Sequence, residues 1–149
     1  NDVYNIGCLG KISDYQKSKD GRILINLTGV SRFKIIEEMP TKKLYREFKV
    51  DYNDFSEDLE NNHHEIDSSR LIEKAKTFFK KNGLLLNWIE FQKLDYVQKI
   101  NTLAMIAPIT NEEKQKLLEA ISIEKKIQTL ESIISFYLYE TSFNNQTLQ

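Results

Sequence analysis

The sequence has little of what most reactive or metal-binding sites are made from. It contains one cysteine, Cys8, and two histidines, His63 and His64, among 149 residues. One cysteine cannot form a disulfide within the chain, and this set cannot supply the ligands of a cysteine-rich zinc site. The composition therefore excludes a disulfide-stabilised fold and favours a reducing, cytoplasmic setting.

The sequence also lacks an excess of charge of one sign and any long apolar run. With 21 Lys and Arg against 22 Asp and Glu, the net charge of -1 argues against general binding of nucleic acid or of an anionic membrane. The longest apolar runs, such as 104–109, are far shorter than the roughly 20 residues that cross a bilayer. We therefore expect a globular protein without a membrane partner, and nucleic acid is a disfavoured partner.

The few glycines do not form a nucleotide-binding loop. Gly7 and Gly10 precede Lys11, but a phosphate-binding loop of this type needs four residues between its glycines and a Ser or Thr after the lysine. Here two residues separate the glycines, and Ile12 follows the lysine. Bends in strands explain the glycines better, so the sequence predicts no nucleotide cofactor.

Other reactive groups have simpler explanations too. His63 and His64 could ligate a metal, but adjacent residues of an extended segment point to opposite sides, which favours an exposed linker. Cys8 could be a nucleophile, yet its apolar neighbours favour a small buried side chain. Glu37 and Glu38 could act as acid and base, but solvated charges at a strand end explain them equally well. The sequence therefore predicts no catalytic residue and no metal.

The first 55 residues have the alternation of β-strands. Apolar side chains recur at every second position over 23–27, and residues 32–37 alternate similarly. Half-buried antiparallel strands show this pattern. With a last strand over 45–52, we expect about four strands in an antiparallel β subdomain over residues 1–55.

Small residues mark the turns between these strands. Asp20 and Gly21 supply the positive φ angles that a tight hairpin turn needs. Gly29 lies between two of the predicted strands and indicates a second hairpin or a bulge.

A segment rich in carboxylates follows the strands. Residues 56–67 contain no lysine or arginine and include the turn-forming pair Asn61 and Asn62. Because like charges repel each other, we expect an exposed acidic linker over 56–67 and a helical subdomain over 68–149.

From Ser68 onward, apolar residues recur at spacings of three and four, which predicts helices. Asp67 or Ser68 can cap the first helix, and Gly83 can end it. A capping box begins at Thr110, and Ser122 can cap a long last helix. Strands followed by helices indicate an α+β fold whose C-terminal part is a helical bundle.

Aromatic residues are the best candidates for a binding surface. Tyr15, Tyr45 and Phe48 lie in the predicted β subdomain, and Trp88 lies in the helical one. Packing in a core is one interpretation of these residues. The other is an apolar groove for extended peptide, since Tyr and Trp bring contact area at a small cost in side-chain entropy. These four residues are the candidate peptide-binding residues.

Three motifs of the β half occur in a recognisable order. They are Gly-x-x-Gly-x-Ile at 7–12, an Asp-Gly turn at 20–21, and Gly-x-x-Arg-Phe at 29–33. In this combination the chain resembles the N-terminal substrate-binding domain of Lon proteases. The helical half agrees, with Pro108, a Lys-Gln-x-Leu-Leu-Glu segment at 114–119 and the long last helix, so the resemblance covers about residues 6–138. The motif residues are Gly7, Gly10, Asp20, Gly21, Gly29, Arg32 and Phe33.

Physical roles for these motif residues follow from their types. The glycines permit bends, the Asp-Gly pair makes the hairpin, and Phe33 fills the core. Arg32 is next to Phe33 and lies on the opposite strand face, where it can bind a carboxylate or carbonyl groups. These motifs secure a fold and perform no chemistry.

The chain departs from the family pattern at three places. Asn101 stands where relatives have an acidic residue, and Lys126 stands where they often have arginine, so an ion pair of the relatives is expected to be missing or replaced. No Pro-Leu-Phe-Pro-Leu type segment precedes the first residue. We therefore expect the first strands of a pseudo-barrel of the pseudouridine-synthase-associated (PUA-like) type to be missing from this sequence.

The resemblance implies a non-catalytic domain that recognises exposed apolar segments of unfolded or client proteins, without ATP or metal. ATPase and serine protease activity would reside in modules outside this chain. The alternative that the resemblance allows is a PUA-like nucleic-acid-binding or adaptor module. An assembly role through self-association of the last helix is also open.

Overall fold

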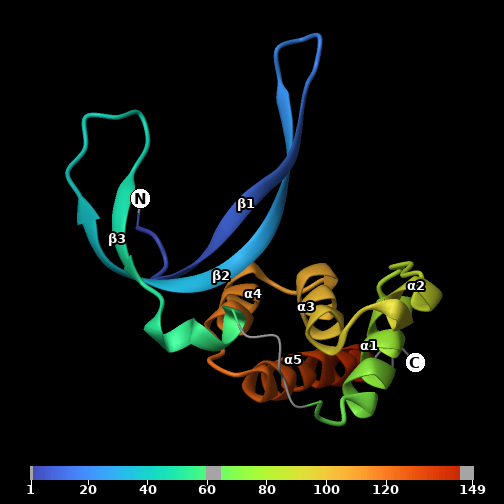
Figure 1. Cartoon of the computed structure of the whole chain (residues 1–149). Coiled ribbons are helices and arrows are strands. Elements are labelled where there is room, and N and C mark those ends of the chain that lie inside the picture. Colours follow the sequence, from blue (N-terminus) through green and yellow to red (C-terminus); the bar gives the residue numbers. More distant parts are fainter. Residues whose placement is uncertain (1, 60–64, 145–149) are drawn as a thin grey trace. The chain divides into compact units, whose positions relative to one another are not determined.

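The computed structural model describes residues 2–59 and 65–144 and divides the chain into two compact units, Asn1–Asn62 and His63–Gln149. The first unit, called here the β unit, contains the strands, and the second contains the helices (Figure 1). This order is the predicted α+β class. The division falls within the acidic segment 56–67, but a short 3-10 helix, η1 (Asn53–Leu59), belongs to the β unit, which therefore extends past the expected boundary at residue 55.

Three antiparallel strands form the sheet of the β unit, in the order β1-β2-β3. They are β1 (Ile6–Lys17), β2 (Ile23–Met39) and β3 (Glu47–Asp51). β2 is shared, because one part pairs with β1 and the other with β3, and it bends between the two (Figure 1).

The predicted hairpin turn is present, whereas the second turn is a bulge. Gly21 has a φ of 87°, and its N–H donates to the Ser18 carbonyl. At Gly29 the strand continues: Gly10 pairs with Gly29 and Leu9 with Ser31, so Val30 is an extra residue in β2. The expected count of four strands is therefore wrong, since two predicted strands are the two parts of β2.

The expectation that these strands are half-buried is also wrong. Every residue from Cys8 to Val30 except Ser18 is exposed. Within the described part of the β unit, only Ser31, Arg32 and Phe55 are buried. Alternation in the sequence identified the apolar face of the strands, but no described segment of the unit packs on it.

The small buried region of the β unit is built around Arg32. Its backbone N–H donates to Asp58 Oδ2 at 2.8 Å, and its Nη2 donates to Asp58 Oδ1 at 2.7 Å. The guanidinium also lies over the Phe55 ring, 4.4 Å from its centroid. The prediction that Arg32 binds a carboxylate is confirmed, and this contact fastens η1 to β2.

Gly7 is required by a close approach rather than by a bend. It lies opposite Phe33 in the β1–β2 register, and a Cβ at Gly7 would be 2.6 Å from Phe33 Cζ. Phe33 is half-buried and meets the Tyr52 ring edge-on at 6.1 Å. Position 7 therefore requires glycine, because the Phe33 ring occupies the space that a side chain at this position would fill.

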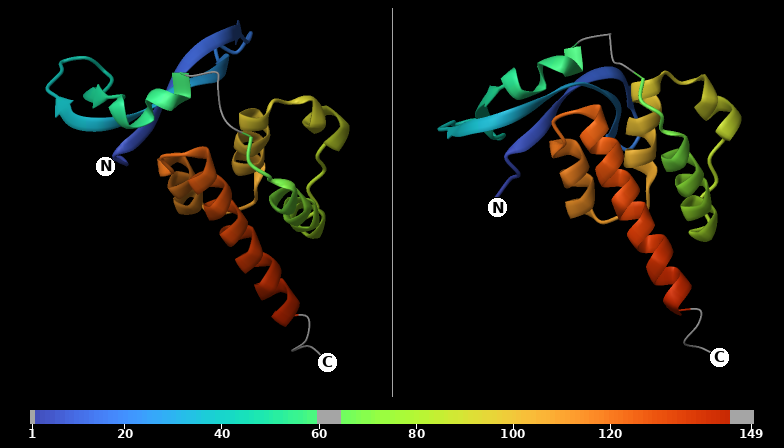
Figure 2. Two further views of the ribbon diagram at one scale, coloured as in Figure 1. Left: turned by 60° about the horizontal axis from the view of Figure 1, so that its bottom comes forward. Right: turned by 90° about the horizontal axis from the view of Figure 1, so that it is seen from below.

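The helical unit is organised around its last helix. The helices are α1 (Ser69–Lys81), α2 (Trp88–Lys93), α3 (Tyr96–Ile106), α4 (Asn111–Glu119) and α5 (Ile123–Asn144). α5 contacts α1, α3 and α4, and both views in Figure 2 show α3 and α4 beside it. The buried core consists of Leu71, Ala75, Phe78, Phe79, Phe91, Ile100, Leu103, Ala107, Leu117, Ile127, Leu130 and Ile134.

Three of the predicted helix-end signals are present, whereas Ser68, the N-cap residue of α1, makes no side-chain capping bond. The Thr110 hydroxyl accepts from the Glu113 N–H at 3.2 Å, and the Glu113 carboxylate accepts from the Thr110 N–H at 2.9 Å, which is the predicted capping box. Gly83 has a φ of 69° after α1. The Ser122 hydroxyl accepts from the Lys125 N–H at the start of α5.

A polar contact replaces the ion pair that relatives are expected to have between α3 and α5. Lys126 Nζ donates to Asn101 Oδ1 at 2.8 Å, and Lys126 is buried. The amide oxygen thus satisfies the buried ammonium group by a hydrogen bond.

Glu131 joins α1 to α5. It accepts from Lys74 Nζ at 2.8 Å and pairs with Arg70 Nε at 2.9 Å. The hydrogen bond from Lys74 lowers the pKa of Glu131 below its ordinary value of 4.5.

We expect the change Asp58→Asn to destabilise the β unit by about 3 kcal/mol, because loss of one partner of a largely buried ion pair leaves the other charge without compensation. Asp20→Asn removes the exposed pair with Arg22 and should have little effect. Urea titration read by amide exchange in β2 measures both variants. Equal losses would contradict the role assigned to Arg32.

Gly7→Ala is expected to lower the stability of the β unit by about 1–3 kcal/mol, because the new methyl group collides with the Phe33 ring. Gly10→Ala is the control, since its nearest side-chain atom would be at an ordinary contact distance of 3.7 Å. Phe33→Leu added to Gly7→Ala should recover part of the loss. If the two alanine variants melt alike, the close approach does not matter.

Glu131→Gln should destabilise the helical unit at neutral pH and have a smaller effect in acid. The carboxylate has a lower pKa when folded than when unfolded, so its contribution is complete above about pH 4.5 and is lost as pH falls through the folded pKa. Thermal unfolding of both proteins between about pH 7 and pH 3 measures the difference. A difference independent of pH would show that the Lys74 contact is not the cause.

Candidate functional site

Large apolar side chains are exposed over most of the β unit. A soluble domain seldom exposes a contiguous apolar area of this kind unless it binds something. Those exposed in β1, β2 and the β2–β3 loop are Leu9, Ile12, Tyr15, Ile23, Leu24, Ile25, Leu27, Val30, Ile36, Met39, Leu44 and Tyr45.

Five of these residues share one face of the β1–β2 hairpin, and we call this set the hairpin face: Ile12, Tyr15, Ile23, Ile25 and Leu27. Ile12 pairs with Leu27, and Tyr15 pairs with Ile25, so each pair lies on one side of the sheet. A register shift between Ile12 and Asp14 brings Ile12 and Tyr15, which are three positions apart, to the same face. The hairpin face is thus continuous along the strands.

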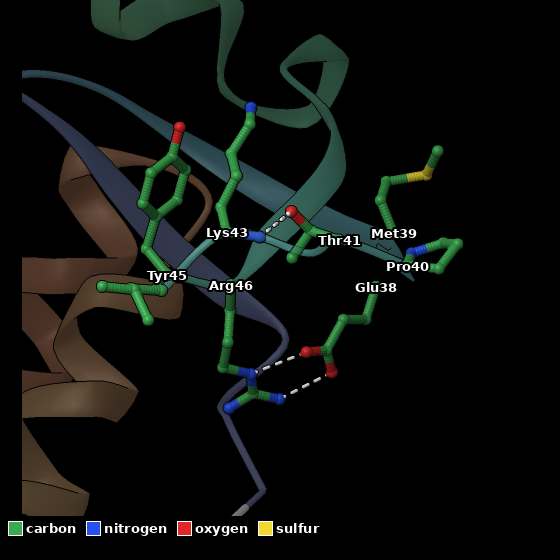
Figure 3. Close-up of a pocket in the computed structure, with 8 residues that line it drawn as sticks. Glu38, Met39, Pro40, Thr41, Lys43, Tyr45 and Arg46 are labelled. Carbon is green, nitrogen blue, oxygen red and sulfur yellow. Dashed lines mark hydrogen bonds and ion pairs between the residues drawn. The ribbon is translucent and has the colours of Figure 1, made fainter.

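The second apolar area is the β2–β3 loop. It surrounds an open hollow of about 630 Å³ (Figure 3). We call Met39, Leu44 and Tyr45 the loop surface, because these exposed apolar residues line the hollow. The remaining lining residues are Glu38, Pro40, Thr41, Lys43 and Arg46.

One ion pair joins the two ends of this loop, and a second lies within its C-terminal part. Arg46 donates from Nε and Nη2 to the two Glu38 oxygens at 2.8 and 2.7 Å, as Figure 3 shows. Lys43 Nζ pairs with Glu47 Oε1. The hydrogen bond from Arg46 lowers the pKa of Glu38, and that from Lys43 lowers the pKa of Glu47, so both carboxylates are charged at neutral pH. Leu44 and Tyr45 are therefore exposed on a loop whose backbone is restrained by ion pairs.

The structure separates the four candidate peptide-binding residues. Tyr15, 71% exposed, lies on the hairpin face, and Tyr45, 61% exposed, lies on the loop surface. Phe48 of β3 is half-buried beneath the Arg46 guanidinium, 5.0 Å from it. Trp88 lies in the helical unit, where its ring packs against Phe79 and Phe91. Tyr45 and Phe48 therefore belong to one area, whereas Trp88 packs against the helical core.

Several residues of these areas were not among the sequence candidates. The aliphatic residues of the hairpin face were interpreted as facing a core, because alternation does not reveal whether a face is covered. The exposure of Leu44 could have been predicted from the sequence. Leu44 follows Lys42 and Lys43 in a loop, and an apolar side chain in a charged loop is exposed.

The described residues offer no group of three or more His, Cys, Asp or Glu that could hold a metal ion. His63 and His64 lie outside the described residues. Cys8 is exposed with a free thiol, not buried as the sequence suggested. Over residues 2–59 and 65–144, none of the helices combines the length and apolar character that crossing a membrane requires.

Comparison with known proteins gives a consistent result. The model of the ATP-dependent protease La (LON) substrate-binding domain family matches residues 1–135. The Lon protease of Bacillus thuringiensis (strain Al Hakam) is 27% identical over an alignment of 138 residues, and the match covers 89% of this chain and 17% of that protein. The chain thus spans about a sixth of the length of this relative.

Two solved structures have the same fold. The Lon N-terminal domain protein from Xanthomonas campestris has a TM-score of 0.59 at 16% identity, over 89% of this chain and 68% of that one. The N-terminal domain of Mycobacterium avium complex Lon protease has a TM-score of 0.61 at 17% identity, over 91% and 73%. With the family match over residues 1–135, the resemblance seen in the sequence motifs is confirmed, and the chain belongs to the Lon substrate-binding domain family.

Proposed function

We propose that this domain recognises exposed apolar segments of unfolded or client proteins through the loop surface and the hairpin face. The observation that carries the proposal is the exposure of large apolar side chains in the β unit, some of them on the β2–β3 loop, which the Glu38–Arg46 ion pair restrains. Membership of a substrate-binding family supports the same role. The domain binds and performs no chemistry of its own.

The loop surface suits this role for energetic reasons. Leu44 is fully exposed, so covering its side chain with a partner removes apolar area from water at about 25 cal/mol per Å². Because the Glu38–Arg46 pair already restrains the loop, binding costs less ordering entropy than binding by a loose loop. Tyr45 adds a rigid aromatic surface of the kind that dominates many interfaces.

Phe48 supports this surface from below. Its ring lies under the guanidinium of Arg46, the residue that closes the loop. We therefore propose that Phe48 positions the loop and that Tyr15 and Tyr45 contact the bound segment. The free thiol of Cys8 is compatible with the reducing cytoplasm, where we place this activity.

The test is a titration of the 149-residue chain with a fluorescently labelled, chemically unfolded protein, followed by anisotropy. We expect saturable binding, and we expect Leu44→Ser and Tyr45→Ser each to weaken it about 5- to 10-fold, the size of a typical interface contact. Circular dichroism confirms that each variant folds.

Leu85→Ser is the matched control, because Leu85 is also fully exposed but lies in the helical unit. Its affinity should equal that of the unchanged protein. Absence of saturation, or equal losses at Leu44 and Leu85, would contradict the proposal. Salt-sensitive retention on single-stranded RNA in place of protein binding would instead support the nucleic-acid alternative.

A further inference from the structure

The C-terminal end of α1 contains a chemically labile pair of residues. Asparagine is followed by glycine once in the sequence, at Asn82 and Gly83, and both residues are exposed to water. Asparagine is thermolabile, because its side-chain amide is lost by reaction with the backbone. The reaction is fastest before glycine, since no Cβ hinders the attacking nitrogen. We therefore expect the most labile amide of the chain at position 82.

The structure holds both reacting groups by hydrogen bonds. The Gly83 N–H, whose nitrogen is the attacking atom, donates to the Lys80 carbonyl at 3.2 Å. The Asn82 Nδ2 group, which leaves as ammonia, donates to the Phe78 carbonyl at 2.8 Å. The fold thus occupies the nucleophile and the leaving group.

A third hydrogen bond completes this end of the helix. The Leu84 N–H donates to the Phe79 carbonyl at 2.9 Å, and Gly83 has a positive φ of 69°. With the bond from Gly83 to Lys80, this is a Schellman motif. The three bonds satisfy carbonyls of the last turn that would otherwise lack partners in the helix. We call these three hydrogen bonds the α1 cap.

Loss of the amide requires the α1 cap to open. The Gly83 nitrogen gives up its proton and bonds to Cγ of Asn82, while the Cγ–Nδ2 bond breaks and ammonia leaves. Water then opens the resulting succinimide ring at one of its two carbonyls, which leaves aspartate or isoaspartate at position 82. Because the closed cap holds the Gly83 N–H on a carbonyl, the reaction proceeds only during local opening of the helix end.

We infer that Asn82 is a site of spontaneous deamidation gated by the α1 cap, and that the modification weakens this cap. The product carries a carboxylate, which cannot donate to the Phe78 carbonyl and lies at the negative end of the helix dipole. Lys80 and Lys81 of the last turn attract the new charge but cannot supply the lost hydrogen bond. The site lies outside the loop surface and the hairpin face, so this inference is independent of the proposed function.

The first test compares the rate in the folded 149-residue chain with that in a synthetic peptide of residues 78–88, both in one mildly alkaline buffer. The tryptic fragment 82–93 holds Asn82 and Asn87, so mass spectrometry assigns the change to one of them. We expect modification of Asn82 alone, at least about tenfold more slowly in the chain, because more than one hydrogen bond must open. Equal rates in chain and peptide, or earlier modification of Asn87, would overturn the inference.

Hydrogen exchange and two proline variants test the gate. Protection of the Gly83 amide measures how often its bond to Lys80 opens, and the slowing of deamidation should match it within a few-fold. Leu84→Pro removes the N–H that bonds to the Phe79 carbonyl and should speed deamidation about fivefold, the effect of one hydrogen bond. Leu85→Pro is the matched control, since the N–H of Leu85 forms no bond of the α1 cap. Equal rates in the two variants would show that the cap is not the gate.

The effect of the product is tested by Asn82→Asp. We expect a lower melting temperature of the helical unit and about fivefold less protection of the Gly83 amide, as one hydrogen bond is lost. Asn87→Asp is the matched control, because Asn87 is the N-cap of α2 and its side chain accepts from the Ile89 and Glu90 N–H groups, as a carboxylate also does. It should melt like the unchanged chain or higher.

Equal melting temperatures of the two aspartate variants would overturn the claim that deamidation weakens the cap. Both variants should bind the unfolded protein with the affinity of the unchanged chain. Failure of the deamidation experiments with binding intact would leave the proposed function standing, and loss of binding in Leu44→Ser says nothing about Asn82.

Discussion

The ion pair between Arg32 and Asp58 determines how the β unit is held together. Arg32 is buried against the Phe55 ring. Its guanidinium and its backbone N–H both donate hydrogen bonds to the Asp58 carboxylate. This contact joins η1 to the middle of β2, between the Val30 bulge and Lys34, where pairing with β3 begins. Because a directional polar contact secures this point, the unit keeps a defined conformation with very little apolar burial.

The two units stabilise themselves in different ways. The helical unit buries aliphatic and aromatic side chains between α1, α3, α4 and α5, and polar contacts such as that of Lys74 with Glu131 join its helices at the periphery. The β unit instead depends on backbone pairing, on Arg32 and on the Glu38–Arg46 pair, and its apolar side chains remain in contact with water. Apolar area that does not stabilise the unit is area that a bound segment can cover.

Local signals in the sequence predicted local structure well. The Gly21 turn, the Thr110 capping box and the end of α1 at Gly83 each depend on residues within one turn of the chain, so short patterns suffice to identify them. Burial depends on segments that are distant in sequence, and alternation over 23–27 indicates an apolar face without showing what packs on it. The role of Asp58 was not predicted for the same reason. Asp58 lies in a run of carboxylates that indicates an exposed segment, and its partner, Arg32, is 26 residues earlier in the sequence. The candidate surface was therefore only partly predicted, with Tyr15 and Tyr45 exposed and Trp88 packed against the helical core.

The register shift beside Ser13 makes the hairpin sensitive to strand length. Ile12 and Tyr15 lie on one face only because a single residue between them is out of step with β2. Deletion of Ser13 would remove this bulge and leave Ile12 and Tyr15 two positions apart, on the same face as before. Loss of one residue beside Ser13 should therefore preserve the hairpin face, whereas gain of one residue would require a second bulge or turn a flanking segment over, so the residue count of β1 is as much a part of the surface as the side chains are.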